Sequence, residues 1–595
     1  MNIKPTILGL LLCLSIFAFI SPAGIAQVSE KEKAQKDLER KQQLEHKTYV
    51  LVDEIASGAL SLKLPENRSF VLSVAADLMW ENDQKRARSL FWDALNTLSL
   101  MMNPVSADRS AKPSVKERAQ SQSSYFAVFS IRQQLLRKVA KRDPQFALDL
   151  LRATRQPPPE PVNAGFRLPD ERDLEQEIAA EAVGRDPRRA LQLARESLAK
   201  GLTFQLLKLL YRLNDKDTEL GTRFAGEILE KLQTHDISTD LHGWQIAIDL
   251  VISSRDRKEE SEPRVPAPKI FRRIQLDKDQ RRTLVELIAN AALGTSVNKN
   301  LLWVVPEVMP EFEEFVPERV ALLQKKFASF SELLNKEQKV SLEYQALLRK
   351  GTPEEMLAFA LKSGEEGEWI QREAILGAVM YRRADSMREF INSKVENEVR
   401  RRDLLDALNT EQIGEAAYRS DLEELRKVLP LVRLKEERAR AMACIARLLE
   451  KKGDHDEAVK LLDEARTLIK ADLNSETQTN ALLELVLAYA LVEPAKAFAI
   501  LERTVDRANR ELAKAILLDK IVRSGAIKKG EIRLQQAGMI PIDFAMMKYG
   551  EGVAALGNAD FDRLKAVADR FERNELRLMA RLLLAQALLK TTIKP

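Results

Sequence analysis

Cysteine is nearly absent from this sequence of 595 residues, which contains only Cys13 and Cys444. Cys13 lies in an N-terminal segment that we expect to be removed, so the mature chain would keep one thiol and could form no internal disulfide. Histidine is also scarce, with four residues in the whole chain. Stability must therefore come from packing, and a metal site would have few histidine ligands available.

Aromatic residues and glycine are sparse as well, at 6% of the chain and 22 residues respectively. Apolar residues make up 45% and charged residues 31%, with strong helix formers dominating. This composition favours an all-α fold and argues against a sheet-rich one. The formal charge is only +5, from 94 basic and 89 acidic side chains, and gives no reason to expect a nucleic-acid partner.

Motifs that would identify an enzyme are missing too. The sequence has no G-x-S-x-G, no H-E-x-x-H, no phosphate-binding glycine loop and no paired C-x-x-C. His235 and His242 are the one near pair of histidines, with Asp236 and Asp240 beside them. A metal site needs three or four convergent ligands, so we interpret this segment as a loop followed by a helix cap. We expect no catalytic, cofactor or metal site.

The N-terminus has the pattern of a secretory signal peptide. Lys4 precedes an apolar run from Ile7 to Ile20, and small residues follow at Gly24 and Ala26. This predicts a signal peptide at residues 1–26, cleaved after Ala26, with an uncleaved anchor as the alternative. The product would be periplasmic or extracellular, and no other stretch is long and apolar enough to span a membrane.

The best-defined unit of the chain is the stretch from Glu437 to Ala471. Two apolar stripes at helical spacing flank the break Lys452-Gly453-Asp454. Gly453 can close the first helix in a left-handed conformation, and Asp454 or Asp456 can cap the second. The pattern predicts two antiparallel helices whose apolar faces need neighbouring helix pairs to cover them.

At these residues the chain resembles the tetratricopeptide-repeat family. The resemblance rests on the turn KKGDHDEA, on small residues at the packing positions and on larger apolar residues between them (Ala446, Ala458, Ala465; Met442, Ile445, Leu449, Leu462). Three residues depart from the family pattern: His455 stands where the family usually has an aromatic residue, Met442 where it often has tryptophan, and Lys470 where a terminal proline is common. The resemblance implies an α-solenoid of stacked antiparallel helix pairs in a right-handed superhelix, with the first helix of each pair lining its inner surface. It nominates Arg440 and Arg447, on either side of Ala443, to bind acidic groups of a partner; a solvated helix face is the alternative.

Similar spacings recur elsewhere. Asp143-Pro144 and Asp186-Pro187 each precede an apolar stripe, as expected of an Asp cap followed by proline at the first helical position. Second helices are expected near four residues separated by 35, 36 and 39 positions (Met387, Leu422, Ala458, Ala497). Near-constant spacing of this kind is typical of a helical solenoid.

Loop-like composition suggests the domain limits. An N-terminal array is expected at 27–252, with loop insertions at 103–122 and 155–172 and a break at Asn214-Asp215. A linker follows at 253–268, and a C-terminal array occupies 269–595. Prolines are expected to cut residues 294–330 into short pieces (Pro306, Pro310, Pro317).

These observations together favour an exported scaffold that binds a protein or peptide and has no catalytic activity. Two alternatives remain. One is a periplasmic or secreted enzyme, such as a hydrolase, with a site spread over several helices. The other is a structural or assembly protein that forms homo-oligomers. The sequence does not indicate the oligomeric state.

Overall fold

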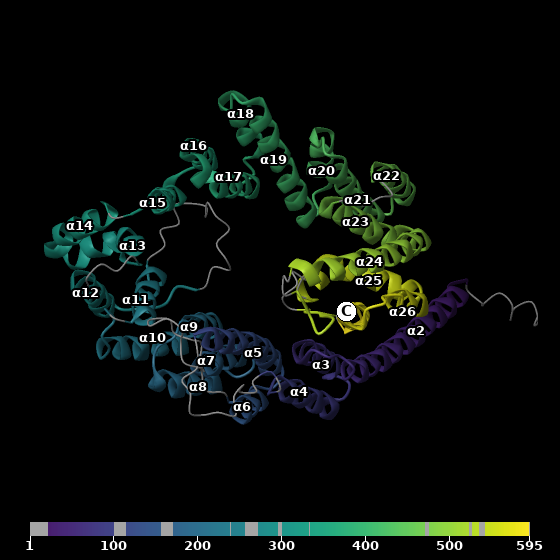
Figure 1. The fold of residues 1–595 in the computed structure, drawn as a ribbon, viewed down its shortest axis with the longest axis horizontal. Helices are drawn as coiled ribbons and strands as arrows, with labels where there is room; N and C mark the ends of the chain where they lie inside the picture. Colours follow the sequence, from purple (N-terminus) through teal and green to yellow (C-terminus); the bar gives the residue numbers. More distant parts are fainter. Residues whose placement is uncertain are drawn as a thin grey trace, which may run out of the picture. The chain divides into compact units, whose positions relative to one another are not determined.

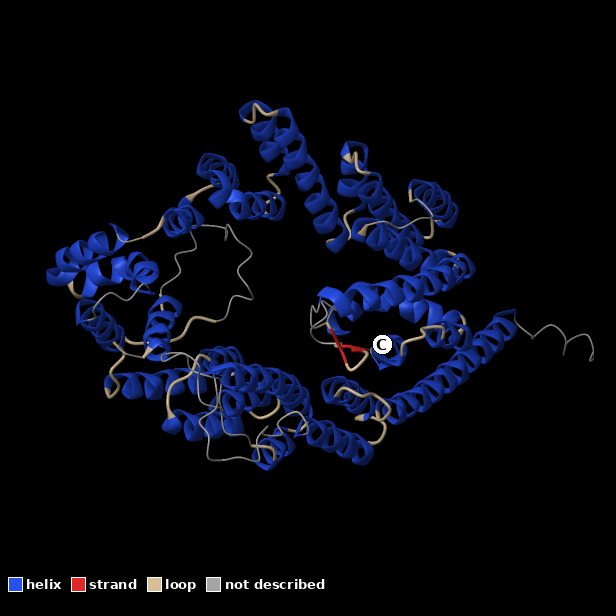
Figure 2. Ribbon diagram, viewed as in Figure 1, coloured by secondary structure: helices blue, strands red, loops and turns tan. Residues whose placement is uncertain are grey.

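The computed structural model describes residues 22–99, 101, 115–155, 171–238, 240–255, 272–294, 300–332, 334–469, 475–522, 526–534 and 542–593. These residues are overwhelmingly helical, and the strands among them are one antiparallel pair of two residues each (Figure 2). The prediction of an all-α fold is therefore confirmed. Among the described helices, none combines the length and apolar character that a membrane span requires.

The chain divides into two compact units, of which unit 1 combines residues 1–90 with 493–595 and unit 2 holds 91–492. The sequence predicts a boundary at the linker 253–268, of which residues 256–268 lie outside the described residues. The signal-peptide prediction likewise falls mainly on residues 1–21, which are not described, and its cleavage site at Ala26 lies near the start of the first described helix.

Unit 1 brings together elements from both ends of the sequence (Figure 1). They are α2 (Pro22–Ala59), α3 (Pro65–Met79), the first part of α4 (Gln84–Ser99), α24 (Pro494–Val522), β1 (Ile527–Lys528), β2 (Glu531–Ile532), α25 (Ile542–Ala559), α26 (Phe561–Asp569) and α27 (Asn574–Ile593). Helix α27 packs against α2, α3, α25 and α26. At the contact with α2, a Cβ atom on Gly58 would lie 2.9 Å from a methyl carbon of Leu578, so glycine allows the two helices to approach closely.

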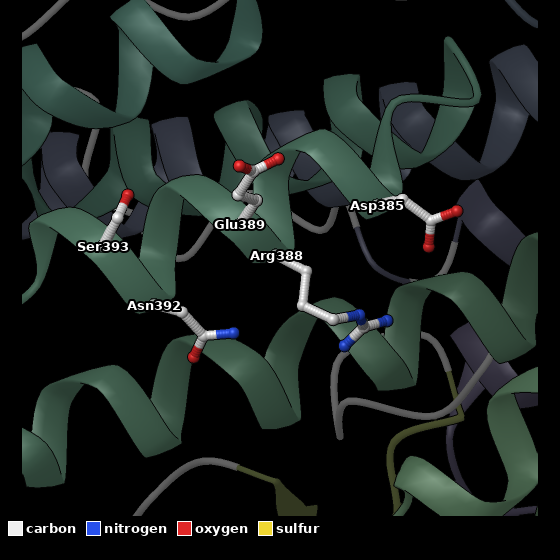
Figure 3. A pocket seen from close by; sticks show the side chains of 5 residues that line it. All are labelled: Asp385, Arg388, Glu389, Asn392 and Ser393. Atoms are coloured by element: carbon white, nitrogen blue, oxygen red, sulfur yellow. The ribbon is translucent and has the colours of Figure 1, made fainter.

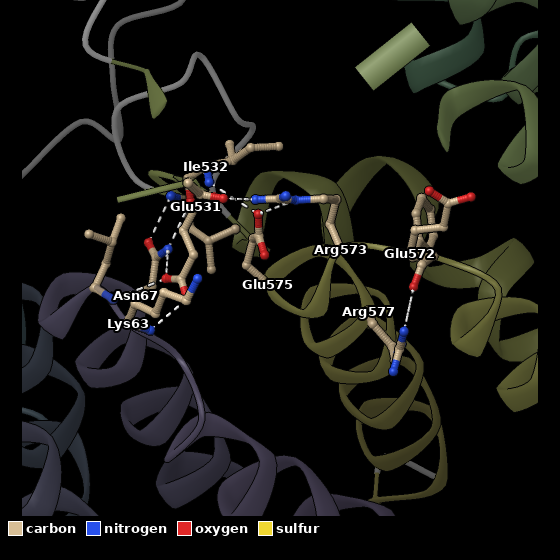
Figure 4. Close-up of polar contacts among 12 residues, drawn as sticks. Lys63, Asn67, Glu531, Ile532, Glu572, Arg573, Glu575 and Arg577 are labelled. Atoms are coloured by element: carbon tan, nitrogen blue, oxygen red, sulfur yellow. Dashed lines mark hydrogen bonds and ion pairs between the residues drawn. The ribbon is translucent and has the colours of Figure 1, made fainter. Parts of the chain in front are cut away.

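The β1–β2 turn of unit 1 joins the start of α3 to the start of α27 (Figure 4). The buried carboxylate of Glu531 accepts the backbone N–H of Leu64 at 3.0 Å and that of Lys63. The buried side chain of Asn67 donates to the carbonyl of Ile532 at 2.8 Å, and Glu575 accepts the N–H of Ile532 at 3.1 Å. Segments more than 460 positions apart are thus connected by buried hydrogen bonds.

Unit 2 begins within α4 and continues through a series of helical pairs. Its helices are α5 (Val115–Arg142), α6 (Pro144–Ala153), α7 (Glu171–Ala182), α8 (Pro187–Lys200), α9 (Gln205–Lys216), α10 (Thr218–Gln233), α11 (Leu241–Ser253), α12 (Lys278–Gly294), α13 (Asn300–Phe315), α14 (Pro317–Glu332), α15 (Lys336–Lys350), α16 (Pro353–Ser363), η2 (Gly364–Gly367), α17 (Glu368–Met380), α18 (Ala384–Lys394), α19 (Glu398–Tyr418), α20 (Leu422–Val428), η3 (Leu429–Leu431), α21 (Lys435–Lys452), α22 (His455–Leu468) and α23 (Glu476–Val492).

Within unit 2, the first helix of one pair also packs against the first helix of the next. This holds for α5, α7 and α9, and again for α17, α19, α21 and α23. Asp143 and Asp186 cap α6 and α8 by accepting the N–H groups of Phe146 and Arg189, each with proline at the first helical position. The interpretation of the Asp-Pro repeat as the start of second helices is confirmed at both sites.

The predicted hairpin of 437–471 forms α21 and α22, with residues 470–474 outside the described residues. Gly453 ends α21 in the left-handed conformation, with φ of 89°. Asp454 takes the capping position of α22, but its side chain makes no capping hydrogen bond. Ala446, Ala458 and Leu462 are fully buried, so the two predicted stripes do face the core.

Three local predictions are wrong. Residues 115–122 belong to helix α5 rather than to a loop, while 102–114 lie outside the described residues. Pro306 and Pro310 lie inside α13. The helix continues through both positions, although each proline removes one of its backbone hydrogen bonds. The break between α9 and α10 is at Asp217, which caps α10, and not at Asn214-Asp215. Of the expected insertion at 155–172, residues 156–170 are not described, and α7 begins at Glu171.

Candidate functional site

Helix α18 carries the candidate binding hollow of unit 2. Asp385, Arg388, Glu389, Asn392 and Ser393 line an open depression of about 520 Å³ (Figure 3). Their spacing of three, one, three and one residues places them along one face of the helix. The opposite face buries Met387 and Ile391 in a core shared with α16, α17 and α19. One helix therefore supports the core on one side and presents polar groups on the other.

Arg388 is the most constrained side chain of the hollow. Its guanidinium donates to the amide oxygen of Asn409 at 2.7 Å and to that of Gln412 at 2.9 Å, both on α19. The orientation of both side-chain amides is fixed, because the NH₂ group of Asn409 donates to the carbonyl of Leu431 at 2.9 Å and that of Gln412 donates to Glu424. Arg388 is thus held by two neutral amide oxygens, and each amide is itself fixed by a further hydrogen bond.

Burial lowers the pKa of Arg388, and the nearby charges of Asp385 and Glu424 oppose that shift. Asp385 itself accepts a hydrogen bond from Lys427 of α20 at 2.7 Å, and this bond raises the pKa of Lys427. In Figure 3, the side chains of Arg388 and Glu389 leave α18 at the two edges of this face. The hollow therefore offers a fixed cationic donor, an amide, a hydroxyl and two carboxylates, which suits a polar, hydrogen-bonding ligand.

The tetratricopeptide-repeat resemblance nominates Arg440 and Arg447 of α21 as partner-binding residues. Arg440 donates to Glu437 of its own helix at 2.7 Å; burial lowers its pKa, but Glu437 and Glu484 outweigh that effect and raise it. Arg447 contacts the sulfur of Cys444 at 3.7 Å, and burial raises the pKa of this thiol. The structure thus places the two arginines on either side of Cys444, close to acidic groups of the same unit.

The histidine pair lies at the start of α11. His235 is 2.9 Å from a carboxylate oxygen of Asp240, which also caps α11 by accepting the N–H of His242. The ring of His242 packs edge-on against Phe204, with centroids 4.1 Å apart. The expected loop and cap are confirmed. Within the described ranges, no cluster of three or more potential metal ligands is found.

The α18 hollow was not predicted from the sequence. Asp385, Arg388 and Asn392 do recur at helical spacing, but so do many polar residues on exposed helix faces. The distinguishing feature is the support that Asn409 and Gln412 give to Arg388, and these residues lie on a different helix, more than 20 positions away.

No family model matches the chain, and no curated protein matches its sequence. Among solved structures, the chain aligns with a "Circular tandem repeat protein with novel repeat topology and enhanced subunit contact surfaces" at 13% identity, covering 91% of this chain and 99% of that one. The TM-score is 0.16, which is too low to support any structural or functional argument.

Proposed function

We propose that this chain is an exported helical-repeat scaffold that binds a protein or peptide, and that its helical pairs form a superhelix like that of tetratricopeptide repeats. The observation that carries the proposal is the α18 hollow, where Arg388 is immobilised by two amides of the next helical pair. A donor that is already fixed loses little entropy when it binds, which favours recognition. The predicted signal peptide and the stacking of first helices are consistent with this role.

A polypeptide fits the donors and acceptors of the hollow. Its main chain offers both N–H and C=O groups, and these match Asn392, Ser393 and the fixed guanidinium of Arg388. The hollow is open and follows one face of α18, so an extended segment can lie along it.

Site-specific photocrosslinking tests the proposal. A photoreactive amino acid at the exposed position Asn392 of the full chain, expressed in its native host, should yield one reproducible protein adduct. Adding Arg388→Gln should lower the adduct yield about tenfold, since a hydrogen bond from a charged group contributes about 1.5 kcal/mol or more. Arg372→Gln, at an exposed arginine of α17, is the matched control and should leave the yield unchanged.

Other results would point elsewhere. An adduct with a second copy of the chain would support the assembly role, and equal yields with Arg388→Gln and the control would reject the hollow as the binding site.

A further inference from the structure

A second polar surface lies on unit 2, across the first helices α5, α7 and α9. Glu177 and Glu181 are one turn apart on α7, and cationic side chains from the two flanking helices converge on them. Arg137 of α5 pairs with Glu177. Lys208 of α9 lies 3.2 Å from Glu177 and 3.3 Å from Glu181, and Arg212 lies 2.7 Å from Glu181. The ion pairs thus run across three neighbouring helices.

The charges are arranged in two layers. The acidic side chains form the inner layer, with 2% of Glu177 and 5% of Glu181 exposed. The cations form the outer layer, since 39% of Arg137, 33% of Lys208 and 36% of Arg212 are exposed. Because the nearest charges dominate the potential felt by a partner, this surface is positive toward solvent.

Cations also outnumber the acids they cover. Lys141, one turn beyond Arg137 and exposed, belongs to the same group, because its charge acts on Glu181 together with those of Arg212 and Lys208. Among the described residues of this group, four cations therefore cover two carboxylates, an excess of two positive charges. Around Arg440 and Arg447, by contrast, two cations meet two acids, Glu437 and Glu484. The excess distinguishes the surface on α5–α9 from the one that the sequence nominated.

We infer that this surface, the basic strip (Arg137, Lys141, Lys208 and Arg212), binds an acidic segment of the protein partner. The inference rests on the proposed scaffold function. The buried glutamates hold three of the four cations in a fixed row, so an acidic peptide meets charges that are already positioned. These three cations are bent back toward α7 and only about a third exposed. Narrow carboxylate side chains can reach them more easily than a flat membrane surface can.

Fluorescence anisotropy with a labelled peptide of ten glutamates tests the inference on the full mature chain. The wild type should bind, and binding should weaken as salt is raised from 50 to 300 mM. Lys141→Glu cancels the excess of two charges without removing a cation that directly pairs with Glu177 or Glu181. It should weaken binding about tenfold. Lys394→Glu, at an exposed lysine of α18, makes the same charge change away from the strip and should have no such effect.

A second variant, Lys208→Gln with Arg212→Gln, should also weaken binding about tenfold or more, with circular dichroism verifying that the helix content is retained. The inference is overturned if the wild type does not bind the peptide or if Lys394→Glu is as damaging as Lys141→Glu. It is also overturned if phosphatidylglycerol vesicles bind in place of the peptide. A protein adduct at Asn392 that persists in all strip variants would leave the scaffold function standing while rejecting the strip.

Discussion

The carboxylate of Glu531 accepts the backbone N–H of Leu64 at 3.0 Å, across 467 positions of sequence. Leu64 occupies the capping position of α3 and has no side chain able to cap it. An acid from the distant β-turn therefore accepts the N–H of the capping residue, as the Glu or Gln at the third helical position does in a capping box. A negative charge is also favourable at this end of the helix because of the helix dipole.

Replacing Glu531 by alanine should destabilise unit 1 by about 2–4 kcal/mol, since buried N–H groups lose a charged acceptor. Urea titration followed by circular dichroism measures the loss, and hydrogen exchange should show faster exchange in α3. Asp562→Ala is the control. Its exposed pair with Lys47 should contribute less than about 1 kcal/mol. Equal losses in the two variants would contradict the importance of the Glu531 cap.

Gly453→Ala should lower the stability of unit 2 by about 1 kcal/mol, because φ of 89° is costly for a residue with a Cβ. Beyond the adjoining backbone, nothing lies within 4 Å of the Cβ position at Gly453 or at Gly414 of α19, so a methyl group would not be crowded at either position. Gly414→Ala, inside a helix, should instead stabilise by about 0.5–1 kcal/mol. Thermal melts of the two variants should shift in opposite directions.

Asp186→Ala should cost about 1 kcal/mol, because the cap of α8 loses its acceptor for the N–H of Arg189. Asp186→Asn keeps an oxygen at the same place and should recover most of this loss. Comparing the urea midpoints of the two variants separates capping from other effects of the substitution. Similar midpoints would show that the hydrogen bond contributes little.

The stability of unit 2 should depend on pH through the carboxylate of Glu181. Burial alone would raise its pKa, but the hydrogen bond and charge of Arg212, with the charges of Lys208 and Lys141, lower it below 4.5. A lowered pKa in the folded state stabilises the fold above about pH 4.5, and this contribution is lost as pH falls further and the carboxylate is protonated. The stability of Glu181→Gln should therefore fall less steeply than wild type between pH 5 and 3, whereas Glu423→Gln, at an exposed position, should follow wild type.

Local chemistry allowed several elements to be predicted from sequence. The Asp-Pro pairs at 143–144 and 186–187 identified helix starts because cap and proline act within one turn, and Gly453 identified a helix end for the same reason. The predicted helix breaks at Pro306 and Pro310 were wrong, because the interactions along the rest of α13 stabilise it by more than the lost hydrogen bonds cost. The α18 hollow and the basic strip could not be predicted, since both depend on which helices become neighbours.

The pairing of α2 and α3 with α27 affects the order in which the molecule can fold. A ribosome adding about 5–20 residues per second needs about 20–90 seconds to pass from Leu64 to Glu531. Throughout that interval the first helices lack the partner that covers them. The earliest-made segment must therefore wait for the last-made one, and a chaperone that shields it in the meantime would act on α2 and α3.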